Sequence, residues 1–440
     1  MTDASLSERG TRDAEALESP LARVAVVYGS PWFNPIVLAE AARETPCRLL
    51  WVLDGRDAET APQARFLDRV GDVVDVAGLD VPSTAAALRP FAPSAITTFS
   101  DFLMPLTAAL ARQLSLVYHS ELTAGWLSDK SQQRLALHAA GVPGPAVWTV
   151  PGEPKEWPAF VAQLRFPVVV KPRRGTGSVA TARADDEGEL SGLLARFADV
   201  DGGLLVEEYL VGRDHAGPFA DDFAVELMVQ EGHVFRLATT GKFTHAPPFR
   251  GRGTFLPSHV DPPIETALFD AAEAATVALG IRDSFVNVDV KLTPDGPRVV
   301  EVNGRLGGHV QLLMELAGGP PVLPLVFRLA LGRAMAEDPA VTRILGDGWS
   351  AVGYFASVQV PMEATRLLGV TGFDDVAALP HVSIVLRKGR QGDSFDWTEG
   401  ANSGVCEVFG SVERIENLAA ARRQIDDLIE VEFEGTADGA

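Results

Sequence analysis

The chain has 440 residues, of which 46% are hydrophobic, so it is long enough to form more than one domain with large buried cores. Its 38 basic and 59 acidic residues give a formal net charge of −21, and so acidic a chain is a poor candidate for binding nucleic acid. Its two cysteines, Cys47 and Cys406, argue against a disulfide framework or a zinc site, and no apolar run reaches the roughly 18 residues of a membrane helix.

The first residues, 1–22, are polar and contain no apolar core. They predict a disordered leader instead of a signal peptide. Because the chain also has few cysteines, which fits a reducing compartment, we expect a cytoplasmic protein that does not associate with a membrane.

The next segment alternates apolar runs with a helical stretch at residues 35–43, a pattern that predicts a parallel α/β sheet. The buried strands are expected at residues 24–28, 48–54 and 95–100. Gly29 and Ser30 follow the first of them, but the full G-x-G-x-x-G pattern of a dinucleotide site is absent. A tight turn from strand to helix is therefore the favoured interpretation.

A helix capped by Ser128 or Asp129 carries Lys130 in its first turn, where a lysine is most simply exposed to solvent. A short strand then leads into KPRRGTGS, residues 171–178, which combines cations, hydroxyls and glycines. Backbone N–H groups in such a loop can surround phosphates. The loop is not a Walker P-loop, because its lysine precedes its glycines.

The middle of the chain predicts mostly strands. Residues 204–209 form a strand that carries Glu207 and Glu208. Further elements are a hairpin with strands at residues 223–229 and 233–240, and helices at 186–197 and 264–279. Between them, residues 242–257 are rich in Gly, Pro and Arg, and a loop of that length is usually a lid or a binding segment.

Two runs that alternate with period two, residues 285–292 and 298–304, predict a β-hairpin. The residues between them, TPDGP, have the chemistry of a turn. We expect Leu292 to pair with Arg298 across this turn. The rest of the register follows from that pair.

In this register Asp289 faces Glu301 and Asn287 faces Asn303, all on one face. The other face is apolar, with Val286, Val288, Val290 and Leu292 against Val300 and Val302. Carboxylates directly opposite each other repel, and a divalent cation would offset the repulsion. The ligands are all oxygens, which suits Mg²⁺. A solvated polar face is an equally good interpretation of the hairpin alone, but the sequence RLGGH at residues 305–309 follows at once and favours a phosphate site.

The C-terminal part predicts a further α/β unit. Its strands are expected at residues 351–360, 382–388 and 406–411, with an amphipathic helix at 415–429. A short helix at residues 311–317 links this unit to the hairpin.

Taken in order, five motifs resemble those of one family. They are DK at 129–130 followed by GVPGP, then VVVKPRRGTGS, LLVEEYLVG, VDVKLT and GPRVVEVNGRLGG. The chain resembles the ATP-grasp superfamily over residues 24–434, and within it the carboxylate–amine ligases that join amino acids into dipeptides, the L-amino acid ligases.

The resemblance implies an α/β protein with the ATP-grasp fold. Its expected parts are a leader (1–22), a Rossmann-like N-terminal domain (24–120), a linking helix with a small lid (121–205), a catalytic subdomain (206–345) and a C-terminal α/β subdomain (346–434). ATP is expected between the lid and the larger C-terminal half.

The resemblance also assigns site residues. ATP would be contacted by Lys130, Lys171, Gly175, Thr176, Gly177, Ser178, Glu207, Glu208, Tyr209 and Leu210. Mg²⁺, or Mn²⁺ in its place, would be held by Asp289, Glu301 and Asn303, and the catalytic residues would include Arg305 and Lys171. His309 is a further catalytic candidate on the sequence itself, because Gly307 and Gly308 place it beside Arg305. Two features depart from the family: the first metal ligand is Asp where Glu is common, and the phosphate loop has only two glycines.

The implied reaction is amide-bond formation between two small molecules, an amino-acid carboxylate and an amine or second amino acid, through an acyl phosphate with release of ADP and phosphate. His245, His259 and His309 are candidates for a base or a substrate contact. Alternatives are an ATP-grasp ligase or carboxylase acting on another acid, and a nucleotide-binding regulatory protein without activity. Relatives are often homodimers, and the sequence gives no independent sign of that state.

Overall fold

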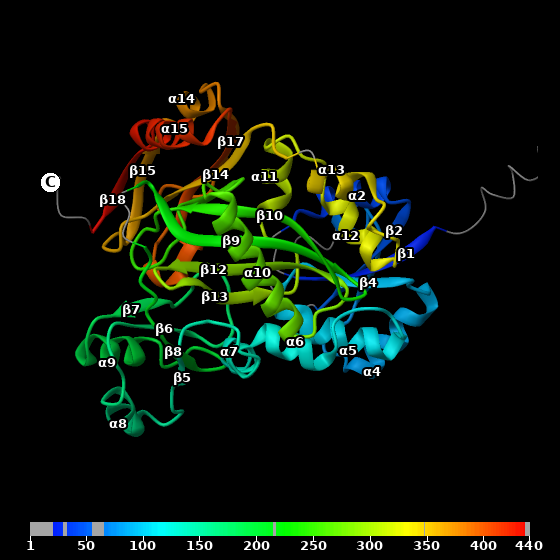
Figure 1. The fold of residues 1–440 in the computed structure, drawn as a ribbon, viewed down its shortest axis with the longest axis horizontal. Coiled ribbons are helices and arrows are strands. Elements are labelled where there is room, and N and C mark those ends of the chain that lie inside the picture. The colour runs from blue at the N-terminus through cyan, green and yellow to red at the C-terminus, as the bar shows by residue number, and fades with distance from the viewer. Residues whose placement is uncertain (1–20, 30–32, 55–65, 214–216, 347, 436–440) are drawn as a thin grey trace, which may run out of the picture.

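The structure, a computed structural model, describes residues 21–29, 33–54, 66–213, 217–346 and 348–435. Among these residues the strands form four sheets, and the mixture of helices and strands confirms the predicted α/β class (Figure 1). The predicted leader lies outside the described residues except for its last two positions, and Ala22 already begins the first strand. No helix in these ranges is both long and apolar enough to cross a membrane.

The N-terminal sheet is parallel, as predicted, with strand order β3-β2-β1-β4. Its strands are β1 (Ala22–Tyr28), β2 (Cys47–Leu53), β3 (Asp72–Asp75) and β4 (Ala95–Thr98). Helices α2 (Pro35–Glu44), α4 (Val81–Leu88) and α5 (Met104–Leu114) pack around them. Alternate residues of β1 belong to two different cores, so both of its faces are buried, as is usual in parallel sheets.

Two short helices, α6 (Glu121–Ser128) and α7 (Lys130–Ala139), lead to the lid. Asp129 lies between them and caps α7 by accepting hydrogen bonds from the backbone N–H groups of Ser131 and Gln132. Of the two predicted caps, Asp129 is the one observed. Lys130 is the first residue of α7.

The lid is a four-stranded antiparallel sheet with order β5-β8-β6-β7 and a hydrophobic core of its own. Its elements are β5 (Val147–Thr149), α8 (Trp157–Val161), β6 (Val168–Pro172), β7 (Ala182–Ala184), α9 (Glu187–Arg196) and β8 (Leu204–Glu208). In Figure 1 these elements project from the lower left of the molecule.

The largest sheet has eight strands in the order β13-β12-β9-β10-β11-β14-β17-β16. They are β9 (Phe219–Gln230), β10 (His233–Phe243), β11 (Gly253–Leu256), β12 (Ser284–Thr293), β13 (Gly296–Asn303), β14 (Val352–Gln359), β16 (Val382–Arg387) and β17 (Gly404–Val412). Helix α10 (Pro262–Ala278) covers the apolar face of β9, β12 and β13. The opposite face is apolar at Met228 and Phe285, and further along it carries polar residues such as Glu226, Asn287 and Asp289.

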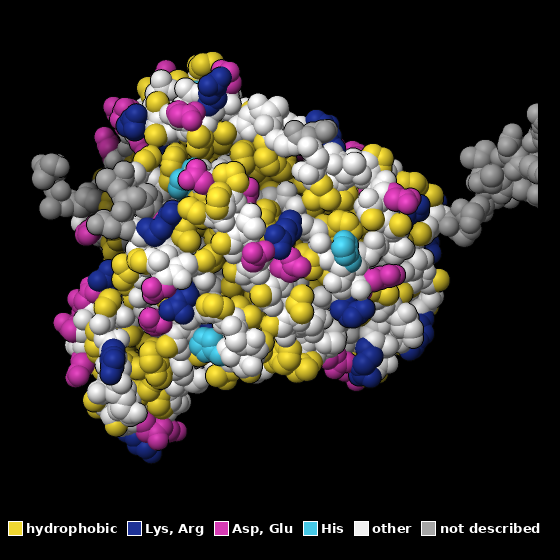
Figure 2. All heavy atoms as spheres, in the orientation of Figure 1, with side chains coloured by type: hydrophobic (Ala, Val, Ile, Leu, Met, Phe, Trp, Pro, Cys, Tyr) yellow, Lys and Arg dark blue, Asp and Glu magenta, His cyan; other side chains and the backbone are white. Residues whose placement is uncertain are grey.

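This sheet runs across the predicted boundary near residue 345. The remaining elements are α11 (Val310–Leu316), α12 (Leu323–Ala330), α13 (Pro339–Gly346), β15 (Arg366–Thr371), α14 (Phe373–Ala377), α15 (Ile415–Leu428) and β18 (Glu430–Glu434). The predicted loop at residues 242–257 is wrong in part, since Lys242 still belongs to β10 and β11 pairs with both β10 and β14. On the face seen in Figure 2, acidic and basic side chains are interspersed.

The predicted register of the β12–β13 hairpin is right at the polar residues and wrong at the turn. Asp289 pairs with Glu301 and Asn287 with Asn303, as predicted, but Arg298 pairs with Lys291 instead of Leu292. The turn is tighter than predicted, because Thr293 pairs with Gly296. A β-bulge at Val300 restores the register by adding one residue to β13.

The prediction that Val300 lies on the apolar face is wrong, because of the same bulge. Val299, instead of Val300, pairs with Val290 and is fully buried, whereas Val300 lines the polar cavity described next.

Candidate active site

A cavity of about 360 Å³ lies between the lid and the polar face of the large sheet. The predicted residues that line it are Lys130, Lys171, Gly175, Thr176, Gly177, Ser178, Glu207, Glu208, Tyr209, Leu210, Asp289 and Glu301. They come from α7, the lid and the β12–β13 hairpin, so the fold brings together segments more than a hundred residues apart. Asn303, Arg305 and His309 are not among the lining residues.

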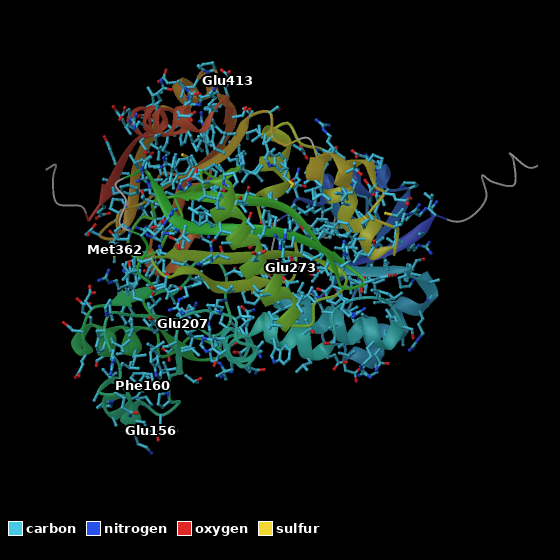
Figure 3. All side chains as sticks on the ribbon, viewed as in Figure 1. Glu156, Phe160, Glu207, Glu273, Met362 and Glu413 are labelled. Carbon is cyan, nitrogen blue, oxygen red and sulfur yellow. The ribbon has the colours of Figure 1, made fainter. Side chains whose placement is uncertain are left out.

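Lys171 is anchored by Glu207, which is 3% exposed (labelled in Figure 3). The Nζ atom of Lys171 lies 2.6 Å from Glu207 Oε2, and Nη2 of Arg134 lies 3.3 Å from Glu207 Oε1. Burial opposes the charge on Glu207, but the two cations outweigh it and lower its pKa. The Glu207 side chain is therefore engaged by Lys171 and Arg134, and its predicted contact with ATP stays a prediction.

The glycine loop folds over the cavity. Gly177 has a φ of 65°, in the left-handed region that favours glycine, and the Lys130 ammonium donates a hydrogen bond to Gly175 O. The loop is also tied to residues 397–403, because Ala401 N donates to Gly177 O at 2.8 Å and Ala180 N donates to Thr398 O at 2.7 Å. Opening of the loop would have to break these backbone hydrogen bonds.

The opposed carboxylates of the hairpin each pair with a lysine. Lys242 Nζ lies 2.5 Å from Asp289 Oδ1, and Lys130 Nζ lies 3.0 Å from Glu301 Oε1. Lys242 comes from β10, within the segment that the sequence predicted to be a loop. Burial lowers the pKa of Lys242, but Asp289 and Asp222 outweigh this and raise it, so the side chain is a cation.

A second ion pair lines the same cavity beside the hairpin. Lys291 Nζ lies 2.8 Å from Asp222 Oδ2, and His245 Nδ1 lies 3.8 Å from the same oxygen. Burial lowers the pKa of His245 despite Asp222, so its imidazole is neutral at neutral pH. Lys291 lies two residues after Asp289 on β12, so the alternation of side chains could have identified it, whereas Asp222 could be found only by placing β9 beside β12.

A row of buried polar side chains crosses three strands next to Asp289 and Glu301. Glu226 on β9 pairs in register with Asn287 on β12, which pairs with Asn303 on β13. Glu226 is fully buried, and burial raises its pKa to about 7, although hydrogen bonds from Asn287 and Gly307 oppose the rise. The sequence contains a signal for Glu226, because it is the one charged residue in the apolar run of β9 from Phe223 to Val229.

Arg305 is held by the N-terminal domain. Its Nη2 atom lies 2.5 Å from Asp101 Oδ2, and both side chains are 10% exposed. Within the described part of the chain, neither Arg305 Nε nor Asp101 Oδ1 has a hydrogen-bond partner. Buried polar atoms normally have a hydrogen-bond partner, so a substrate group or a water molecule would be expected to bind Arg305 Nε and Asp101 Oδ1.

The other two candidate histidines, His259 and His309, are not among the residues that line the cavity. His309 stacks on Phe355 with ring centroids 4.2 Å apart, and burial lowers its pKa. His259 packs among Phe219, Phe223 and Phe255. The structure thus places His245, and neither His259 nor His309, at the cavity.

The residues of the hairpin fit Mg²⁺ by their chemistry. Asp289 and Glu301 are opposite each other on the hairpin and both line the cavity, and Asn303 Oδ1 accepts no hydrogen bond from any described residue. In the described ranges no three His, Cys, Asp or Glu side chains are grouped to hold a metal. Mg²⁺ does not need such a cage, since it is usually bound by one or two carboxylates together with substrate phosphates.

Lys171→Ala is expected to weaken ATP binding roughly ten- to a hundredfold, because a hydrogen bond between charged groups is worth about 1.5–3 kcal/mol. Calorimetric titration with ATP measures the effect. Gly29→Ala serves as the comparison in the N-terminal sheet, where the new Cβ would meet the end of the Leu103 side chain at 2.7 Å. A larger loss in Gly29→Ala than in Lys171→Ala would show that the nucleotide binds at the N-terminal sheet instead of in this cavity.

Comparisons with known proteins agree with this geometry. The ATP-grasp domain family matches residues 127–309. Carnosine synthase 1 of Homo sapiens is 27% identical over 245 residues, which are 50% of this chain and 29% of that protein. The D-alanine–D-alanine ligase of Aromatoleum aromaticum is 29% identical over 213 residues, 48% of this chain and 65% of that protein. The chain therefore spans less than two thirds of either relative.

The crystal structure of an L-amino acid ligase from Bacillus licheniformis superposes with a TM-score of 0.75 at 19% identity, covering 94% of this chain and 100% of that one. This likeness confirms the ATP-grasp fold that the five motifs predicted. Because the family match runs from α6 to the end of the β12–β13 hairpin and beyond, it includes most of the cavity walls. The chain therefore carries an ATP-grasp domain at residues 127–309 and has the ATP-grasp fold.

Proposed function

We propose that the protein is an ATP-dependent ligase that forms an amide bond between the carboxylate of an amino acid and the amine of a second small molecule. The observation that supports this best is the composition of one cavity, where four lysines and two opposed carboxylates lie under a glycine loop. D-alanine–D-alanine ligase and L-amino acid ligase, to which the chain is similar, are named for joining amino acids.

In the proposed first step, a carboxylate oxygen of the acid attacks the γ-phosphorus of ATP, the bond to the β-phosphate oxygen breaks, and ADP leaves. Phosphoryl transfer requires mainly positioning and neutralisation of charge. Lys130 and Lys171 line the cavity on the lid side, and Lys242 and Lys291 line it on the sheet side. Their ammonium groups would exchange carboxylate partners for phosphate oxygens when ATP binds.

Asp289, Glu301 and Asn303 would hold Mg²⁺, which when bound supplies positive charge to the phosphate oxygens. Binding of the cation would relieve the repulsion between the two carboxylates and release Lys130 and Lys242 toward the nucleotide. Arg305 would contact the transferred phosphate with its planar fork of donors, which suits phosphate oxygens.

In the second step, the amine nitrogen attacks the acyl carbon, the carbon–oxygen bond to phosphate breaks, and phosphate leaves. An acyl phosphate is hydrolysed by water, so the site has to be closed during this step. The glycine loop, tied through Gly177 and Ala180 to residues 397–403, provides such a cover. His245, neutral and at the cavity wall, could accept the proton that the amine releases.

The test is phosphate release from ATP and Mg²⁺ with pairs from a panel of amino acids and amines. We expect release that requires both an acid and an amine, with the matching amide found by mass spectrometry. Release driven by bicarbonate or by a carboxylate that is not an amino acid would replace the proposal with the alternative ligase or carboxylase. ATP binding without turnover on any pair would support the regulatory alternative.

A further inference from the structure

The hydrogen bonds of the buried polar row run in one direction. Asn303 Nδ2 donates to Asn287 Oδ1 at 3.3 Å, and Asn287 Nδ2 donates to Glu226 Oε1. Asn287 and Asn303 are 9% and 6% exposed, and Glu226 is fully buried, so the row is screened from solvent. Each amide is thereby oriented by the residue beside it.

Glu226 sets this direction, because its Oε1 atom accepts the hydrogen bond from Asn287 Nδ2. Its second oxygen, Oε2, accepts from Gly307 N at 3.4 Å, and a backbone N–H can only donate. Both neighbours of Glu226 are therefore donors. Because Asn287 donates to Glu226 through its nitrogen, its oxygen accepts from Asn303 Nδ2. Asn303 Oδ1 is therefore the atom at the end of the row farthest from Glu226.

We propose that Glu226 is a positioning residue for the cation site: through Asn287 it fixes the Asn303 amide so that an oxygen, instead of an NH₂ group, is presented beside Asp289 and Glu301. The inference rests on the proposed function, in which Asn303 is a metal ligand. An NH₂ group in that place would repel a cation.

Glu226→Gln is the most direct test, since the two side chains have nearly the same size. The oxygen of the substituted side chain would accept from Gly307 N, which leaves the new NH₂ group to donate to Asn287 Oδ1. Asn287 would then turn and donate to Asn303 Oδ1, and Asn303 would present its NH₂ group to the cation. The direction of every hydrogen bond between side chains in the row would be reversed.

The readout is binding of Mn²⁺ in the presence of ADP, followed by electron paramagnetic resonance, which does not depend on turnover. We expect Glu226→Gln to weaken Mn²⁺ binding by roughly 10- to 100-fold, the usual cost of losing a residue that orients a metal ligand. Glu273→Gln is the matched control. Glu273 lies on α10, across the sheet from the row, and pairs with Arg236 on the surface, so the same change of charge should leave Mn²⁺ binding unaltered (Figure 3).

A second substitution separates orientation from stability. In Glu226→Gln combined with Asn303→Asp, the reversed row ends on a carboxylate, which accepts from Asn287 and still offers an oxygen to the cation. We expect this double variant to recover most of the lost affinity. In the single variant Asn303→Asp, Asn287 lies between two carboxylates and can donate to only one of them. We therefore expect Asn303→Asp to raise Mn²⁺ affinity more in the Glu226→Gln background than in the wild type.

Three results are decisive. Equal Mn²⁺ binding by Glu226→Gln and the wild type would overturn the positioning role while leaving the ligase proposal intact. An Asn303→Asp effect of the same factor in both backgrounds would also overturn it, because a merely structural Glu226 gives additive effects. Absence of Mn²⁺ binding in the wild type with ADP would overturn both the positioning role and the proposed cation site.

Discussion

Asp289→Asn and Glu301→Gln are each expected to lower turnover at least about a hundredfold, since removing one major charge-stabilising group typically costs roughly 3 kcal/mol. The two carboxylates pair directly across β12 and β13 and line the same cavity. Each substitution removes one anionic ligand and frees one lysine, Lys242 or Lys130, to repel the cation. Steady-state turnover at several Mg²⁺ concentrations measures the loss.

Folding is controlled in the same experiment by circular dichroism and by Asp270→Asn, an exposed carboxylate that pairs with Arg236 on the far side of the sheet. This control should keep full activity. If both hairpin variants turned over at a near-normal rate at low Mg²⁺, the assignment of the metal pair would be wrong.

Arg305→Lys should lower turnover roughly a hundredfold while changing ATP affinity much less, because it keeps the positive charge but loses the planar fork of donors. In the structure one arm of the fork binds Asp101, and Nε is left for another partner. A lysine cannot serve both at once. Measuring kcat together with ATP binding separates the two effects.

The matched control is Arg298→Lys on the same hairpin, where the arginine contacts the carbonyl of Gly144 at 3.5 Å. It should have little effect on either quantity. Equal losses of kcat and ATP affinity in Arg305→Lys would show that Arg305 binds the nucleotide in the ground state instead of contacting the transferred phosphate.

The pairing of the site's carboxylates could be predicted from the sequence, because side chains alternate along strands and a tight turn fixes which residues meet. The prediction of Leu292 opposite Arg298 was wrong by one position at the turn. The bulge at Val300 cancelled that error before Asp289 and Glu301 were reached. Periodicity does not reveal a bulge, so agreement at the polar residues depended on a feature that the pattern cannot show.

The partners of these residues could not be predicted in the same way. Asp101 and Arg305 are 204 positions apart and meet only because the N-terminal domain packs against the end of the hairpin. The sequence predicts a loop at Lys242, because the glycines and prolines after it hide the end of β10 and the short strand β11. Strand order within a sheet is set by tertiary packing, and the sequence pattern of one hairpin carries no information on its neighbours.

The position of His309 shows that closeness in sequence to Arg305 does not place a residue at the cavity. It follows Arg305 by four positions and was predicted to be catalytic on that ground. The turn that precedes α11 carries it to Phe355 and Phe409, outside the cavity lining. Its catalytic role stays a prediction, and among the three histidines considered the geometry favours His245.

The most direct test of the proposed reaction follows oxygen from the carboxylate substrate. An acid labelled with ¹⁸O in both carboxylate oxygens is turned over with ATP, Mg²⁺ and the amine found in the panel, and the products are separated and analysed by mass spectrometry. An acyl-phosphate route transfers one ¹⁸O atom to inorganic phosphate, with ADP as the nucleotide product and one amide formed per ATP. Label in AMP, with pyrophosphate released, would contradict the acyl-phosphate mechanism.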